Sequence, residues 1–358
     1  MEASNESPTG ATAIALPSTD LDASIGFFRD QLGFRLDMIF PADAPREARM
    51  SGHGLTVHLD TACASSPETL SLKTSDPALL ALDSPVVSPD GLSISVVSMT
   101  AGSTDVPATL ATHVQSAAGS GDWGVGRAGM QYRDLVPDRL GGAWIASHIR
   151  IPDGGPVPDY VHHHHVRFQI IFCRRGWVRV VYEDQGAPFV MREGDCVLQP
   201  PHIRHRVLEC SDGFEVVEVG SPAEHQTLVD HEMTLPTKSV APARSFSGQT
   251  FVRHQAAEVA WRASEYAGLE MQQTGIGEAT SGIGDVRVLR PAGNVESVDL
   301  TADHTFLFRF ILDGSLILES DEGASALESG AAFVFPPGRR HGVRSLSADC
   351  RLLEVVGT

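Results

Sequence analysis

Residues 161–177 read VHHHHVRFQIIFCRRGW, and residues 194–207 read GDCVLQPPHIRHRV. The first stretch places four consecutive histidines before a β-branched and aromatic run, and the second contains a further histidine, His205. Side chains two residues apart on a strand project to the same side, so an HxH pair can bind one metal ion. A histidine from a partner strand can complete the set, and imidazole suits Fe, Ni, Cu, Zn and Mn. The two stretches therefore predict a metal site between strands.

The chain from Val125 to its end has the sequence pattern of an all-β fold. Short β-branched and aromatic runs alternate with Gly, Pro and Asp at roughly regular spacing, which is typical of a sandwich or barrel. The runs form two similar sets, residues 144–219 and residues 286–356, with a polar stretch around residues 236–247 between them. This pattern predicts an internal repeat of two β-domains.

The two histidine-containing stretches resemble the two motifs of the cupin superfamily. The first motif runs HxH, three or four residues, Glu, six residues, Gly; the second runs Gly, five residues, PxG, two residues, His. The matching positions are Gln169 in place of the Glu, Gly176, Gly194, Pro200 and His205, with His202 in place of the second motif's Gly. The resemblance covers about residues 142–218 and extends in weaker form to the C-terminus. It implies a β-barrel with one mononuclear metal held by His162, His164, Gln169 and His205.

The run of four histidines allows two registers. Strict alternation counted back from Gln169 favours His163 and His165 as ligands, whereas the family's spacing, with a bulge, selects the pair one residue earlier. We take His162 and His164, because the other register would turn Arg167 inward beside the metal, and we keep His163 and His165 as the alternative. A neutral Gln169 raises the Lewis acidity of the metal, or leaves a three-histidine site with the amide as a hydrogen-bonding neighbour.

The second repeat keeps one of the two motifs. Residues 330–341 read GAAFVFPPGRRH, in which Gly330, Pro336, Gly338 and His341 all fall at the positions of the second motif. The first motif has decayed, since Leu307 stands at the Glu position and only His304 remains nearby. Two histidines from different motifs seldom hold a metal strongly. We therefore expect a degenerate cupin that buries a sheet edge of its partner.

The first sixty residues predict a small βαββ module. Asp20 is a candidate N-cap for a helix, and apolar residues recur after it at helical spacing. Residues 20–37, DLDASIGFFRDQLGFRLD, resemble the vicinal oxygen chelate superfamily of glyoxalase and bleomycin-resistance proteins. The strands that carry that family's metal ligands hold no His or Glu here, although His53, His58 and Asp60 lie near. We expect a scaffold or dimerisation module without a metal, and residues 61–122 are either its degenerate second half or a connector.

Charge and composition exclude several classes of partner. The 358 residues include 45 acidic and 27 basic ones, which gives a formal net charge of −18 with no basic block. Nucleic acid and membrane surfaces are therefore poor partners, because the long-range field repels them. No stretch reaches the ~18 apolar residues of a membrane span, and the N-terminus lacks the features of a secretory signal. Five scattered cysteines are expected to be reduced thiols in a cytoplasmic protein.

We divide the chain into residues 1–122, the oxygen-chelate-like module with its connector; residues 123–238, the metal-binding cupin; and residues 239–358, the degenerate second cupin. An unpaired module and a second barrel without a metal favour a homodimer, which buries such surfaces at little cost.

The cupin resemblance implies a reaction class and not a substrate. The first hypothesis is a dioxygenase that chelates a small enolisable or acidic organic substrate at one divalent metal, iron first, or zinc, nickel, manganese or copper. Arg167 would orient an acidic substrate, and His148 and Tyr182 are further candidates, as an acid/base group and as part of an aromatic pocket. The alternatives are a redox-neutral, zinc-dependent cyclase, lyase or isomerase, and a non-enzymatic small-molecule-binding cupin.

Overall fold

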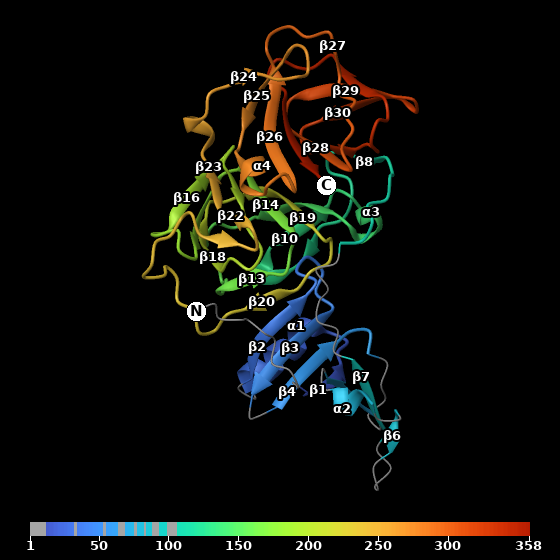
Figure 1. Ribbon diagram of the computed structural model, residues 1–358, viewed down its shortest axis with the longest axis vertical. Helices are drawn as coiled ribbons and strands as arrows, with labels where there is room; N and C mark the ends of the chain where they lie inside the picture. The colour runs from blue at the N-terminus through green and yellow to red at the C-terminus, as the bar shows by residue number, and fades with distance from the viewer. Residues whose placement is uncertain are drawn as a thin grey trace. The chain divides into compact units, whose positions relative to one another are not determined.

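The computed structural model describes residues 12–31, 34–52, 55–63, 69–74, 77–81, 84–87, 93–98 and 106–358. The chain folds into two compact units. The first comprises residues 1–103 and 225–231, and the second comprises residues 104–224 and 232–358. Strands dominate both units (Figure 1), which confirms the mainly β architecture expected from the sequence.

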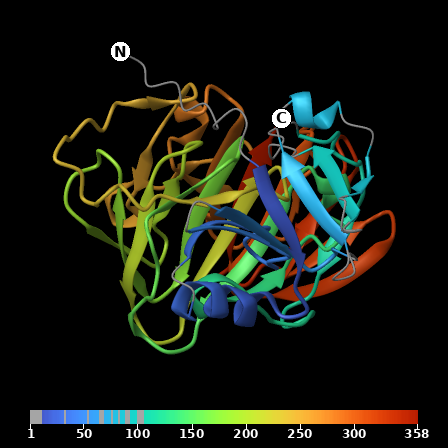
Figure 2. The same cartoon turned by 90° about the horizontal axis from the view of Figure 1, so that it is seen from below.

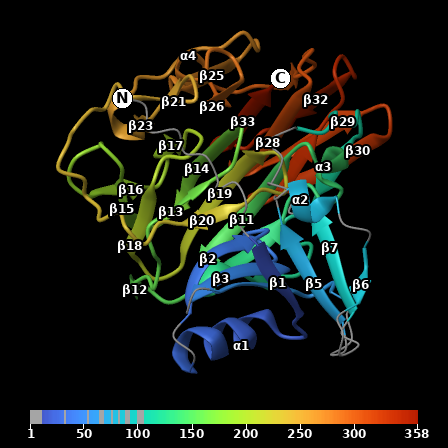
Figure 3. The ribbon, with the colours of Figure 1, turned by 60° about the horizontal axis from the view of Figure 1, so that its bottom comes forward.

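The first unit is a mixed sheet with two short α-helices among its described residues. Its first elements are β1 (Thr12–Pro17), α1 (Leu21–Gly26), the π-helical turn η1 (Phe27–Gln31), β2 (Arg35–Phe40), β3 (Glu47–Gly52) and β4 (Leu55–Asp60). Asp20 caps the helix as expected, because its Oδ1 accepts a hydrogen bond of 3.0 Å from the N–H of Ala23. The helix α1 lies along the sheet (Figure 3), and its residues Leu21 and Ile25 share an apolar core with Met50 of the sheet. The extra strand β3, EARMSG, escapes sequence analysis because only two of its six residues are apolar.

The same sheet continues through the part of the chain that the sequence left undecided. β5 (Thr69–Thr74) pairs antiparallel with β1, and β7 (Ser93–Ser98) pairs parallel with β5, just as β4 pairs parallel with β1. The elements between them are α2 (Pro77–Leu80) and β6 (Val86–Val87), and β20 (Thr227–Val229) pairs with β2 at the other edge. The strands β5 to β7 therefore extend the module and are not a connector. Its likeness to the vicinal oxygen chelate superfamily stays a prediction.

The polar side chains of the first unit pair with one another. Nε2 of His58 lies 2.6 Å from Oε2 of Glu47, and Nζ of Lys73 lies 3.4 Å from Oδ2 of Asp60. His53 lies outside the described residues. Among the residues that are described, the first unit holds no group of three side chains that could bind a metal.

The first barrel of the second unit consists of two facing sheets. One runs β16-β15-β18-β13, with β12 beside β18, and the other runs β23-β17-β14-β19-β11-β10-β9. The strands are β9 (Gly124–Val125), β10 (Gln131–Asp134), β11 (Ile145–Ile151), β12 (Gly155–Pro156), β13 (His162–His164), β14 (Phe168–Arg175), β15 (Trp177–Tyr182), β16 (Phe189–Arg192), β17 (Cys196–Leu198), β18 (His205–Cys210), β19 (Phe214–Ser221) and β23 (Val252–His254). Val178 and Val180 of one sheet meet Cys173 and Val216 of the other in a common core.

The second barrel repeats this layout. Its sheets run β24-β25-β26-β33-β28-β31-β8 and β27-β32-β29-β30. The strands are β24 (Arg262–Ala263), β25 (Leu269–Gln273), β26 (Gly284–Pro291), β27 (Ser297–Asp299), β28 (Phe306–Asp313), β29 (Ser315–Ser320), β30 (Gly323–Glu328), β31 (Ala332–Val334), β32 (His341–Arg344), β33 (Arg351–Gly357) and β8 (Val114–Ser116). β28 lies between β33 and β31 as β14 lies between β19 and β17, and His341 begins β32 as His205 begins β18.

The two barrels exchange edge strands. β8 precedes the first barrel in the chain but pairs with β31 of the second, whereas β23 follows the first barrel and pairs with its β17 (Figure 1). Each barrel thus covers an open edge of the other, which removes a surface prone to edge-to-edge association. The exchange also explains why residues 104–122 belong to the second unit and not to the N-terminal module, where the sequence had placed them.

The two barrels lie against each other (Figure 2), and they share one apolar core. The rings of Trp144 and Phe306 stack with centroids 4.0 Å apart and planes within 2°. Gly284 and Gly357 face each other across β26 and β33 and leave room for the first barrel's aromatic rings. A Cβ atom on Gly284 would lie 2.5 Å from the ring of Phe168, and one on Gly357 would lie 2.3 Å from the ring of Trp144. The rings therefore rest directly on the backbone of the second barrel.

Helices are few and short. The longest α-helix of the described residues, α1, has six residues, and no helix in that part of the chain is long and apolar enough to cross a membrane. All five cysteines are free thiols, and four of them are buried, which fits the expected reduced state.

We predict that Gly284→Ala destabilises the second unit by about 1–3 kcal/mol, the range typical of overpacking a core. The added methyl group would have to displace the buried ring of Phe168. Chemical denaturation measures the free energy of unfolding. Gly293→Ala is the matched control, because no heavy atom lies within 4 Å of its Cβ position. Equal stability of the two variants would contradict the close approach of the barrels.

Candidate metal centre

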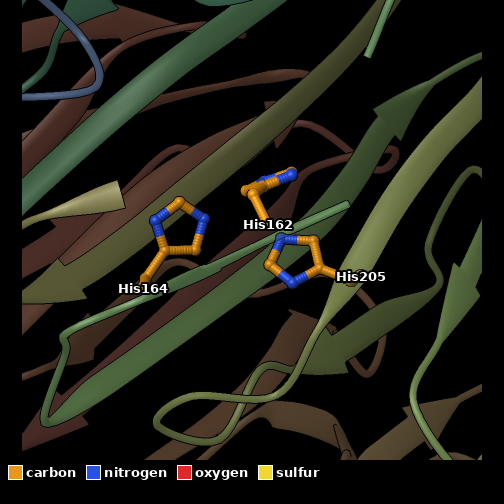
Figure 4. A group of neighbouring side chains, drawn as sticks. All are labelled: His162, His164 and His205. Carbon is orange, nitrogen blue, oxygen red and sulfur yellow. The ribbon is translucent and has the colours of Figure 1, made fainter. Parts of the chain in front are cut away.

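Three histidines come together inside the first barrel. β13 and β18 are antiparallel with His162 directly opposite His205, and the alternation of β13 places His164 on the same face as His162. Each of the three side chains offers a ring nitrogen within 4.8 Å of the other two. Figure 4 shows the rings gathered around a common point, two from one strand and one from its neighbour. All three residues are buried.

Backbone carbonyl groups fix the tautomers of two of these rings. Nδ1 of His162 donates to the carbonyl oxygen of Tyr160 at 2.8 Å, and Nδ1 of His205 donates to that of Ile203 at 3.0 Å. Nε2 of each ring therefore carries the lone pair, and Nε2 of His162 is buried without a hydrogen-bond partner among the described residues. This arrangement is typical of histidines that bind a metal, because the anchored N–H group orients the ring.

Burial keeps two of the rings in the neutral form that a metal requires. Desolvation lowers the pKa of His162 well below its usual value, and the positive charge of Arg127 lowers it further. Desolvation likewise lowers the pKa of His205, to about 4. Both imidazoles are therefore unprotonated at neutral pH and can donate a lone pair without first losing a proton.

A buried ion pair supports His162 from behind. The carboxylate of Asp159 binds the guanidinium of Arg127, and its Oδ1 also lies 3.6 Å from Nδ1 of His162. Its Oδ2 accepts a hydrogen bond of 2.9 Å from the backbone N–H of Val207. Burial would lower the pKa of Arg127, but the neighbouring Asp159 carboxylate more than compensates and raises it. A carboxylate next to the anchored N–H group strengthens the donor power of the ring.

Gln169 presents one unpaired oxygen. Its Nε2 donates to Oε1 of Glu218 at 2.5 Å, and a carboxylate can only accept, so this contact fixes the orientation of the amide. Its Oε1 is buried and makes no hydrogen bond within the described part of the chain. Gln169 lies on the same face of β14 as Cys173, which belongs to the interior core of this barrel. An amide oxygen in this position is available to a cation.

Tyr182 lies beside the histidine group. Its ring stacks on that of His205 with centroids 5.4 Å apart, and its hydroxyl accepts a hydrogen bond of 2.9 Å from Nε2 of Gln199. Burial raises the pKa of the phenol, so the hydroxyl stays protonated. Of the three residues predicted as catalytic, Tyr182 is thus the one that contacts a predicted ligand.

Comparison with known proteins now identifies the fold. No family model and no curated protein matches the sequence. Salicylate 1,2-dioxygenase from Pseudoaminobacter salicylatoxidans, solved as an adduct with gentisate, aligns with a TM-score of 0.51 and 16% identity over 70% of this chain and 82% of that one. A variant of oxalate decarboxylase from Bacillus subtilis aligns with a TM-score of 0.50 and 13% identity over 77% and 88%. Both are cupin-fold proteins. The chain has the cupin fold. At these identities the likeness extends to the fold and no further.

The second cupin barrel carries an arginine beside its remaining motif histidine. Nη1 of Arg309 lies 2.6 Å from Nε2 of His341, the atom that corresponds to the free nitrogen of His205. The same guanidinium binds Glu354 at 2.6 Å and the hydroxyl of Tyr266 at 2.9 Å, and both charged residues are fully buried. A fixed cation therefore stands beside the nitrogen that would bind a metal. The described part of this barrel offers no three-histidine group.

The other two predicted catalytic residues make their contacts elsewhere. Nη1 of Arg167 donates to the carbonyl oxygen of Thr358 at 2.6 Å, so its guanidinium is bound to the C-terminal residue. His148 lies between Arg133 and Glu215, at 3.2 and 2.8 Å, on the face of β11 opposite to the core residue Ile149. Neither contact involves the three histidines, and the structure gives no geometric support to a substrate or acid/base role for Arg167 or His148.

Each of the two histidine pairs considered from the sequence joins a different group of three histidines in the structure. His163 lies on the other face of β13, and it groups with His165, which follows the strand, and with His202. Counting alternation back from Gln169 fails because the stretch between His164 and Phe168 is not a strand. The bulge-like break expected from the cupin spacing is thus real.

Sequence reasoning missed the polar groups around the site. Asp159 stands three residues before the first histidine of the run and could have been noticed there, because a carboxylate often supports a metal-binding histidine. Arg127 and Glu218 are distant in sequence from the histidine run, and no local sequence pattern indicates that they lie near the site.

We predict that His205→Gln lowers the affinity of the inner site for a divalent metal by at least about 100-fold, because it removes one of three imidazole donors. Isothermal titration calorimetry of the metal-free protein with a divalent metal ion measures this affinity. The matched control is His341→Gln, the same substitution at the same motif position of the second barrel, and it is expected to bind as wild type does. A loss of affinity in both variants, or in neither, would contradict the assignment of the site to the first barrel.

Proposed function

We propose that the first barrel is a mononuclear metal centre of an enzyme, and that the enzyme is a dioxygenase acting on a small enolisable or acidic organic compound. The observation that carries this proposal is the group of three buried histidines, two of which have an anchored Nδ1 atom. The cupin-fold neighbours named above support it, since one is a dioxygenase solved with gentisate and the other is a decarboxylase named for oxalate. Both names point to small organic acids.

The residues fit a divalent transition metal. His162, His164 and His205 would hold it, and Oε1 of Gln169, buried without a partner among the described residues, would be a fourth donor or a close neighbour. Such a metal supplies Lewis acidity and, where it is redox active, a route to dioxygen. Imidazole and amide donors are all neutral, so the full double charge of the cation remains to attract an anionic substrate. We infer that the substrate binds as an enolate or carboxylate.

The remaining polar residues of the barrel prepare this site. The carbonyl oxygen of Tyr160 holds His162 in the tautomer that leaves Nε2 free. Asp159 lies beside the same N–H group, and Arg127 balances the charge of Asp159 inside the barrel. Tyr182 covers one side of His205 with an aromatic ring and keeps its proton, so its hydroxyl can donate a hydrogen bond to an oxygen of the substrate. Fixed donors of this kind act strongly where water is excluded.

One observation favours a second candidate, a redox-neutral, zinc-dependent cyclase, lyase or isomerase. A site with only neutral donors makes its metal a stronger Lewis acid than one with a carboxylate ligand, and polarising a substrate oxygen needs no redox change. Asp159 and Glu218, the carboxylates near the site, are engaged by Arg127 and Gln169. The metal that the protein acquires separates the two candidates.

We predict that protein purified without added metal carries iron, or another redox-active ion, in an amount that His205→Gln removes. Elemental analysis of wild type beside the variant measures this difference. Reduced, iron-loaded protein is further expected to bind nitric oxide, an analogue of dioxygen, and to give the electron paramagnetic resonance signal of a half-integer-spin iron–nitrosyl centre. Zinc as the ion lost in the variant, together with no nitrosyl signal, would contradict the dioxygenase and favour the zinc-dependent enzyme.

A further inference from the structure

A second group of three histidines lies on the outer face of β13. His163, His165 and His202 each offer a ring nitrogen within 4.8 Å of the other two. The ring centroids of His165 and His202 are 4.7 Å apart, and those of His163 and His202 are 5.6 Å apart. Because successive side chains of a strand alternate, His163 points to the opposite face of β13 from His162 and His164. His165 follows the strand and His202 lies in the turn before β18, and we call these three residues the outer triad.

Two nitrogens of the outer triad are buried without a partner. His163 is only 4% exposed, and its Nδ1 makes no hydrogen bond within the described residues. Nδ1 of His202 is also buried and unpaired in the same part of the chain. Buried ring nitrogens normally find a hydrogen-bond partner, so each exception calls for an explanation such as a bound ion.

The backbone of His202 adds an independent observation. Its φ of +66° lies in the left-handed region, where glycine is favoured and a residue with a side chain is strained. The cupin motif has glycine at this position, and here an imidazole occupies it instead. The turn between β17 and β18 therefore carries an imidazole at a position where the backbone conformation favours a residue without a side chain. The N–H of His202 also bonds to the carbonyl oxygen of His164 at 3.2 Å, which holds this turn against β13.

We propose that His163, His165 and His202 form a second metal site, separate from the inner one and independent of the reaction proposed above. Three imidazoles with open positions suit a late first-row ion such as Zn²⁺, Ni²⁺ or Cu²⁺. Nη1 of Arg204 donates to the carbonyl oxygen of His202 at 3.3 Å, and its positive charge opposes a bound cation. His165 and His202 are also partly exposed. The outer site therefore binds its ion more weakly than the inner site.

Equilibrium dialysis of chelator-treated full-length protein against Zn²⁺, followed by elemental analysis, tests the proposal. Wild type is expected to bind two ions, and His202→Gly one, since glycine removes the imidazole and suits the left-handed backbone. His205→Gln is expected to keep the outer ion alone, and the double variant to bind none. His304→Gln, outside both groups, is the control and is expected to bind two. A second variant, His163→Gln, leaves the turn unchanged and is expected to weaken the outer site at least tenfold.

A wild-type protein that binds one ion, with His202→Gly and His163→Gln unchanged, would overturn the proposal. So would a His202→Gly variant that keeps its thermal unfolding profile and still binds two ions. The effect of His205→Gln is read separately in the same experiment, so failure of the outer site is distinguishable from failure of the inner one.

Discussion

The register between β13 and β18 is the constraint on which the rest of the site depends. His162 stands opposite His205, and this single pairing fixes which faces the four consecutive histidines occupy. Alternation then sends two of them into the barrel and two out of it. A slip of one residue would exchange the two pairs, separate His205 from His162, and bring the outer pair into the barrel. Local hydrogen bonds from Nδ1 of His162 and of His205 to the carbonyl groups of Tyr160 and Ile203, each two residues earlier in the chain, then orient the two rings.

The two barrels show how one scaffold gives two electrostatic outcomes. In the first, the motif histidine His205 lies beside two other buried imidazoles, those of His162 and His164. In the second, the equivalent nitrogen of His341 faces the guanidinium of Arg309, whose charge is balanced by Glu354. The second barrel thus holds a permanent cation and its buried counter-ion at the position where the first barrel groups three imidazoles. The second barrel also covers an edge of the first with β23 and stacks Phe306 on Trp144.

The spacing of the cupin motifs was enough to predict the β fold and His205 as the partner of the histidine run. The choice between the two histidine pairs needed the break in the strand before Phe168, which composition does not reveal. Arg167 and His148 were predicted as site residues from the chemistry of their side chains. In the structure Arg167 binds Thr358. His148 lies on the face of β11 that is directed at Arg133 and Glu215. The exchange of β8 and β23 and the ion pair of Arg127 with Asp159 join segments distant in sequence, so no local pattern could predict them.

The central claim is that the first barrel holds a metal ion between His162, His164 and His205. Anomalous diffraction from crystals of the full-length protein, measured on both sides of the absorption edge of the bound metal, tests it most directly. The account predicts a strong peak within coordination distance of all three rings, about 2.0–2.2 Å from each nitrogen. An outer ion would give a separate, weaker peak beside His202. A map with no peak among the three inner histidines, in protein that elemental analysis shows to contain metal, would contradict the account.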